Sequence, residues 1–194
     1  MSATTVYLHA GDRPGIYPME QDPGFEAEQV AAMADGAVPL LWLALFRAGD
    51  VSLGDTPWGA AGAPLVGRER GLANLVAAVP ALDRMFGPPV TTHADLLRQA
   101  LQWSPGAWLT IEWWCDNRPS PPDPAALRSA LGAFEEDGDG DGALLELCGL
   151  DPADLPAPRD PGAPLLPHLT AQAAGLRLLL GRAFHQLVPW EQPI

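Results

Sequence analysis

Residues 107–115, AWLTIEWWC, decide the fold that we predict, because they form the clearest strand in the sequence. Their β-branched and aromatic side chains favour extended backbone, and a Pro-Gly pair before them and an Asp-Asn pair after them are turn signals. Residues 4–9, TTVYLH, have the same character and run into the turn-forming sequence AGDRP. We therefore predict that the two segments pair in a small antiparallel sheet.

Helical signals account for most of the remaining sequence. Capping residues and apolar side chains at helical spacing predict helices over residues 22–36, 39–48, 69–78, 92–103, 123–134, 142–148 and 168–188. Pro80 is predicted to break or kink the third of these, with a further turn over residues 81–86. Residues 49–66 are predicted to be a long loop, and residues 151–167, with six prolines, an extended surface segment. The predicted fold class is α+β, a mainly helical single domain over residues 1–194 with a two- or three-stranded antiparallel sheet.

The chain is strongly acidic. Its 194 residues carry a net charge of −13, and all 11 basic residues are Arg, which excludes lysine-based chemistry. A field of this sign repels phosphates and anionic lipid head groups, so we expect neither nucleic acid nor a membrane as a partner. The longest apolar run, residues 37–46, is about half of a bilayer span, and the first residues lack the pattern of a secretory signal. We therefore expect a cytoplasmic protein.

One face of the predicted strand combines aromatic residues with a carboxylate. Because side chains alternate along a strand, this face holds Trp108, Thr110, Glu112 and Trp114. A carboxylate framed by indoles is a candidate general acid, or lines a pocket for a sugar or an aromatic ligand. Asp116 and Arg118, which follow the strand, are further candidates for this site. The alternative is that helices cover the face and that Glu112 lies at an edge, paired with an Arg.

The acidic turn DGDGDG, residues 137–142, lies between two predicted helices. Asp137, Asp139 and Asp141 have the spacing of the first ligands of a calcium loop, so the turn resembles an EF-hand half-site. Position 12 of such a loop is normally a bidentate Glu, whereas this sequence has Cys148 there. A weak Ca²⁺ site is one hypothesis, and a solvated turn in which Asp141 caps the next helix is the other. Apart from calcium we expect no cofactor.

The same turn belongs to a longer acidic stretch. Residues 135–160 contain nine carboxylates and one cation, Arg159. A concentrated negative surface steers a basic protein partner through complementary potential, and Glu135, Glu136 and Asp139 are the candidate contacts. The alternative is a solvated face that keeps the protein soluble.

Motifs for other chemistry are missing from the sequence. No Ser lies in a G-x-S-x-G context, the four His have no metal-ligand spacing, and the Gly-rich residues 59–64 lack the flanks of a dinucleotide fingerprint. Cys115 and Cys148 are expected to be reduced, buried thiols.

These observations favour a small acidic, non-enzymatic protein-interaction module, for example an immunity-like or antitoxin-like inhibitor that masks a basic protein partner. Two alternatives stay open. One is an enzyme or small-ligand binder with an aromatic-lined acidic pocket at Trp108, Glu112 and Trp114, and the other is a weak Ca²⁺-binding domain. The sequence leaves the oligomeric state and the identity of the partner open.

Overall fold

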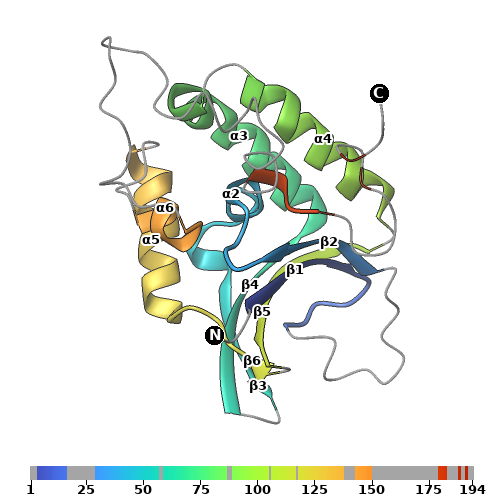
Figure 1. Cartoon of the computed structure of the whole chain (residues 1–194), viewed down its shortest axis with the longest axis vertical. Helices are drawn as coiled ribbons and strands as arrows, with labels where there is room; N and C mark the ends of the chain where they lie inside the picture. The colour runs from blue at the N-terminus through green and yellow to red at the C-terminus, as the bar shows by residue number, and fades with distance from the viewer. Residues whose placement is uncertain are drawn as a thin grey trace.

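The computed structural model of the chain describes residues 4–16, 29–56, 59–86, 89–104, 106–116, 118–137, 143–149, 179–182, 188 and 191. In this part of the chain six antiparallel strands form one sheet (Figure 1). They are β1 (Thr4–Gly11), β2 (Val30–Asp35), β3 (Val51–Thr56), β4 (Gly59–Gly67), β5 (Trp108–Cys115) and β6 (Arg118–Pro119). The strand order is β2-β1-β5-β4-β3, with β6 paired to the end of β5 that β4 does not reach.

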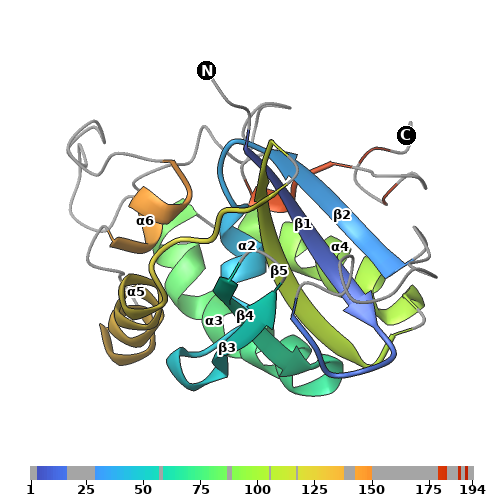
Figure 2. The same cartoon turned by 90° about the horizontal axis from the view of Figure 1, so that it is seen from below.

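The helices gather on one side of this sheet. They are α2 (Leu40–Leu43), the 3-10 turn η2 (Ala48–Asp50), α3 (Arg68–Phe86), α4 (Pro89–Trp103), α5 (Pro124–Asp137) and α6 (Ala143–Leu147). Figures 1 and 2 show α2, α3 and α4 against one face of the sheet, whereas α5 lies beside η2 and β3. Among the described helices none is both long and apolar enough to cross a lipid bilayer.

β1 and β5 form the centre of the sheet. All eight residues of each strand are paired, from Thr4 with Cys115 to Gly11 with Trp108, which confirms the predicted pairing of these segments. Alternation directs one set of side chains toward the helices. This set is Val6, Leu8, Ala10, Leu109, Ile111 and Trp113, and each is at most 5% exposed. Burial of this apolar face builds the main core.

The apolar residues 40–46 complete the core, with no side chain more than 1% exposed. Only Leu40–Leu43 are α-helical, so the helix predicted over residues 39–48 is shorter than expected. The buried indole of Trp42 donates from Nε1 to the carbonyl O of Leu180 at 3.0 Å. A segment near the C-terminus therefore satisfies a polar group at the centre of the core.

Residues 179–182 also extend the edge of β2. Arg182 and Met33 exchange two backbone hydrogen bonds of 2.8 and 2.9 Å, and the Arg182 guanidinium makes two 3.0 Å bonds to Asp35. Leu179 and Leu180 are helical but Gly181 and Arg182 are not, so the helix predicted over residues 168–188 is wrong at this point. Residues 168–178 of that helix, and the Pro-rich residues 151–167, lie outside the described residues.

The prediction of a mainly helical domain with two or three strands is wrong, because two segments that read as helix and loop are strands. Residues 30–35, predicted as the end of a helix, pair with β1 as β2. Most of the predicted loop over residues 49–66 is the β3–β4 hairpin. The small residues of the hairpin have low strand propensity, so the sequence does not indicate these strands, but the packing of the hairpin needs them. A Cβ on Gly62 would lie 2.5 Å from Pro124 Cγ, and one on Gly54 would lie 2.7 Å from Ile16 Cδ1.

The other helices follow the sequence closely. α3 contains Pro80 within it, and α4 spans the predicted residues 92–103. Asp123 Oδ2 accepts a hydrogen bond from the Ala126 backbone N–H and caps α5. The predicted stripe of α5, made of Leu127, Ala130, Leu131 and Phe134, is buried. α6 ends before Gly149, which has the φ of 69° that a helix C-terminus favours.

Replacing Gly181 by Ala will destabilise the protein by about 2–4 kcal/mol, because an Ala at this position is strained in its backbone and overpacks its neighbours. Its φ is 75°, and a Cβ would lie 2.5 Å from Trp42 Cζ2 and 2.7 Å from the Met33 carbonyl O. Gly36→Ala is the matched control, since Gly36 has a φ of 86° but open space around its Cβ position, and will lose only about 1 kcal/mol. Urea unfolding measures both, and equal losses would contradict the docking of residues 179–182 on Trp42.

Candidate functional site

Four polar or aromatic side chains meet on the sheet face that points away from the helices. Tyr7 lies opposite Glu112, and His9 lies opposite Thr110, across β1 and β5. His9, Thr110 and Glu112 are 0%, 3% and 0% exposed, and Tyr7 is partly exposed. The centre of the sheet thus carries an ionisable pair inside the protein.

Glu112 is held by two neighbours. Trp114 Nε1 donates to Glu112 Oε2 at 3.0 Å, and His9 Nε2 lies 3.3 Å from the same oxygen. A carboxylate at this depth needs such partners, because desolvation penalises its charge. Glu112, His9 and Trp114 therefore form one internal polar group, which we call the Glu112 cluster.

The Glu112 cluster is not fully satisfied. Glu112 Oε1 and Thr110 Oγ1 are buried, and neither has a hydrogen-bond partner within the described part of the chain. A buried polar atom in this state costs about 1–3 kcal/mol. The contacts to Oε2 therefore carry most of what stabilises the carboxylate.

Trp114 joins the Glu112 cluster to a second, small apolar cluster. Ile16, which follows β1, packs there with Ala61 and Ala63 of β4, and Leu65 and Trp114 border them. The indole is thus fixed by apolar contacts on one side and by its hydrogen bond to Glu112 on the other.

The exposed end of this face holds Tyr7 and the Asp35–Arg182 ion pair. Burial raises the pKa of the Tyr7 phenol, the negative charges of Asp35 and Glu112 add to the effect, and Arg182 opposes it. The hydrogen bonds that the Arg182 guanidinium donates to Asp35 raise the pKa of Arg182. Both groups therefore stay protonated at neutral pH, and neither supplies a general base.

The sequence correctly places Trp108, Glu112 and Trp114 on one strand face, but the expected open pocket is not what forms around Glu112. Glu112 lies in the middle of the sheet, and its partner is His9 rather than an Arg at an edge. His9 was missed as a partner. The signal that finds it is the register of β1 against β5, which places His9 two residue pairs along from Glu112, in the next pair on the same sheet face.

The candidates that follow β5 lie apart from the Glu112 cluster. Asp116 is exposed and has a left-handed φ of 51°, which turns the chain out of the strand. Arg118 is exposed in β6, where it pairs with Cys115. Neither is hydrogen-bonded or ion-paired to Glu112, so the structure does not assemble the predicted acidic site from these residues.

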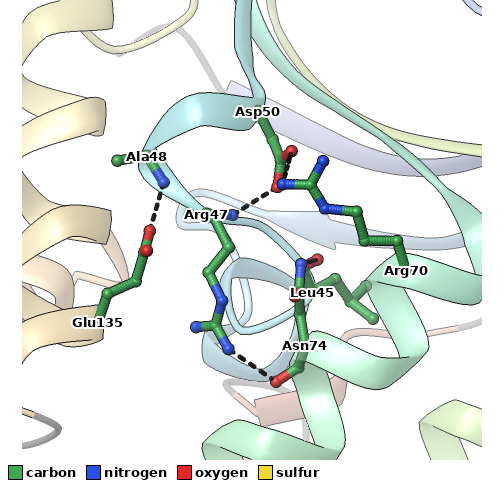
Figure 3. A network of polar contacts seen from close by, with 7 residues as sticks. All are labelled: Leu45, Arg47, Ala48, Asp50, Arg70, Asn74 and Glu135. Carbon is green, nitrogen blue, oxygen red and sulfur yellow. Dashed lines mark hydrogen bonds and ion pairs between the residues drawn. The ribbon is translucent and has the colours of Figure 1, made fainter.

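Glu135 has a structural contact that the sequence did not indicate. Its Oε1 accepts a 2.6 Å hydrogen bond from the Ala48 backbone N–H and ties α5 to η2 (Figure 3). The buried Asp50 accepts from the Arg47 N–H at 2.8 Å and pairs with Arg70 at 3.1 Å in the same network. These contacts hold the segment where the chain leaves the core for β3.

The remaining acidic candidates cannot be placed. Glu136 and Asp137 belong to α5, but their side chains lie outside the described structure, as do Asp139 and Asp141 entirely. The predicted calcium turn is therefore outside the described residues. Within those residues no three His, Cys, Asp or Glu side chains are grouped as metal ligands.

Both cysteines are free, as predicted. Cys148 is fully buried in the core, and burial raises the pKa of its thiol far above the usual range. Cys115 is only partly buried, unlike its prediction. A thiol that stays protonated is a poor nucleophile, so Cys148 has a packing role.

Helices α3 and α4 leave a surface groove of about 210 Å³ between them. Its lining is mostly apolar and includes Leu75, Val79 and Ala94, with the Asp95–Arg98 ion pair at its rim. Ligand pockets are usually larger and converge on several polar groups. This groove does not have that character.

Comparison with known proteins adds no relative, since no family model, no curated protein and no solved structure matches the chain.

Replacing Glu112 by Ala will destabilise the protein by about 3–5 kcal/mol, because it removes the buried carboxylate that lies 3.3 Å from His9 Nε2 and accepts the Trp114 indole N–H. Glu146→Ala, which removes an exposed carboxylate, will change stability by less than about 0.5 kcal/mol. Urea unfolding of both variants checks this. A Glu112→Ala loss as small as that of Glu146→Ala would contradict the internal role of the carboxylate.

Proposed function

We propose that this chain is a non-catalytic, acidic binding module that engages and masks a basic protein, in the manner of an immunity-like inhibitor. The observation that carries the proposal is how the described charges are used. Seven of the nine described arginines make side-chain contacts with other described residues, and the exposed Arg13 and Arg118 do not. A larger set of exposed carboxylates forms no ion pair, so more negative than positive charge is left exposed in the described part of the chain.

The arginines serve the fold in two ways. Arg47, Arg68, Arg84 and Arg128 donate to the backbone carbonyls of Asn74, Ser104, Pro80 and Val51. Arg70, Arg98 and Arg182 pair with Asp50, Asp95 and Asp35. The hydrogen bonds hold four guanidinium groups against backbone carbonyls. The ion pairs offset the charge of the other three.

Other exposed carboxylates have no such partners. Those that form neither an ion pair nor a hydrogen bond with another described residue are Asp12, Asp55, Glu69, Asp116 and Glu146. Complementary charge raises association rates and selects partners of opposite sign. This distribution supports a cationic protein as the partner.

The geometry of Glu112 favours binding over catalysis. Its carboxylate is 0% exposed, and the oxygen that has partners is engaged by His9 and Trp114. A general acid has to come within hydrogen-bond reach of the substrate. In this arrangement Glu112 has no such access.

Full-length protein immobilised and exposed to lysate of its native host will retain a basic protein at low salt and release it as salt is raised. Neutralising three carboxylates together, with Asp55→Asn, Glu69→Gln and Glu146→Gln, will weaken the purified pair by about 3- to 100-fold. Titration calorimetry at two salt concentrations measures this.

Glu112→Gln is the control, because it removes one formal charge from the interior instead of the surface. Its folded form will bind the partner as tightly as the unmodified chain. Retention of an acidic partner, affinity independent of salt, or loss of binding in folded Glu112→Gln would overturn the proposal.

A further inference from the structure

Edge strand β3 has backbone N–H and C=O groups that form no hydrogen bond with another described residue. In the described structure β3 pairs with β4 alone and ends the sheet. Val51 lies opposite Pro64, which has no N–H to donate, so Val51 occupies a non-hydrogen-bonded pair. Its N–H donates outward to the Ala48 carbonyl O, and its carbonyl O accepts from Arg128 at 2.9 Å.

Hydrogen-bonded and non-hydrogen-bonded pairs alternate along an antiparallel ladder. Leu53 and Asp55, two and four residues after Val51, therefore also direct their N–H and C=O groups away from β4. Among the described residues, internal contacts cover these groups at Val51 but not at Leu53 or Asp55. β3 thus presents two consecutive outward-facing pairs of donor and acceptor.

The side chains beside these groups are accessible. Leu53 is 62% exposed and lies opposite Gly62, which has no side chain to cover it. Asp55 is exposed, forms no ion pair within the described residues and lies opposite Ala60. Both side chains are on the same sheet face, because they are two residues apart.

We infer that β3 is the docking edge for an extended segment of the basic partner, which adds to the sheet as a seventh strand. This inference rests on the proposed function. An added strand places its own side chains opposite Leu53 and Asp55, two residues apart. The matching segment has an apolar residue and, two positions away, a Lys or Arg that pairs with the Asp55 carboxylate.

A second copy of this chain fits the edge poorly in the three two-fold registers centred on residues 53–55. Centring on Asp55 sets two like charges opposite each other, and centring on Gly54 sets Asp55 opposite Leu53. Centring on Leu53 needs the Val51 backbone groups, which Ala48 and Arg128 already occupy. Each copy also carries a net charge of −13. The edge therefore disfavours pairing with a second copy of this chain and favours a cationic strand.

The test uses the full chain, isotope-labelled for NMR, and two capped peptides, Thr-Val-Thr-Lys-Thr-Val (the Lys peptide) and its counterpart with Glu in place of Lys (the Glu peptide), in which the charged residue is two positions from a Val. The Lys peptide will shift the amide signals of Leu53 and Asp55, and the Glu peptide will not. Asp55→Asn will weaken binding of the Lys peptide by about two- to fivefold, as expected for one cross-strand charge pair. Asp95→Asn, which neutralises an exposed carboxylate of α4 off this edge, will leave binding of the Lys peptide unchanged.

Two variants make the result decisive. Leu53→Pro removes an outward N–H at an edge position where Pro is tolerated, and will abolish the shifts. Asp55→Lys reverses the preference, so that the Glu peptide binds instead, and this variant does not depend on how Leu53→Pro folds. Shifts elsewhere on the chain, or a preference that Asp55→Lys does not reverse, would overturn the inference.

These outcomes are separate from those of the proposed function. Salt-dependent capture of a basic protein without peptide shifts at β3 would leave the function and remove this edge. Peptide binding at β3 without any basic partner in the lysate would leave the docking edge and remove the proposed function.

Discussion

The structure depends on the antiparallel pairing of β1 with β5. This pairing runs the full length of both strands and fixes both faces of the sheet at once. One face packs Val6, Leu8 and Ile111 into the main core, and the other brings His9 beside Glu112. Because the side-chain period of a strand is two, a slip of one residue would move Glu112 into the apolar core. The buried carboxylate therefore penalises every register that is shifted by an odd number of residues.

This constraint bears directly on function. The residue that looks most catalytic in the sequence, Glu112, is committed to the inside of the sheet, with Trp114 and His9 around Oε2. Arginines are likewise committed to carbonyls and carboxylates of the fold, as Arg128 and Arg182 illustrate. Among the described residues, exposed carboxylates and the edge of β3 are left as candidate contacts for a partner. The proposed binding role rests on these two features.

The sequence predicts the elements whose signals are local and periodic. The strand over residues 107–115, its pairing with residues 4–9 and the buried stripe of α5 are all recovered. β3 and β4 are missed because their Gly, Ala and Pro residues have low strand propensity and are chosen for close packing against Ile16 and Pro124. The contact of His9 with Glu112 depends on register, which no local pattern encodes.

Native-state amide hydrogen exchange tests the central claim most directly. If the β1–β5 pairing holds the fold together, the amides of Leu8 and Ile111 will exchange only through global unfolding, with the free energy measured by urea denaturation. The outward amides of Leu53 and Asp55 will exchange far faster. Fast exchange of Leu8 and Ile111 through local opening, while the helices stay protected, would contradict the account.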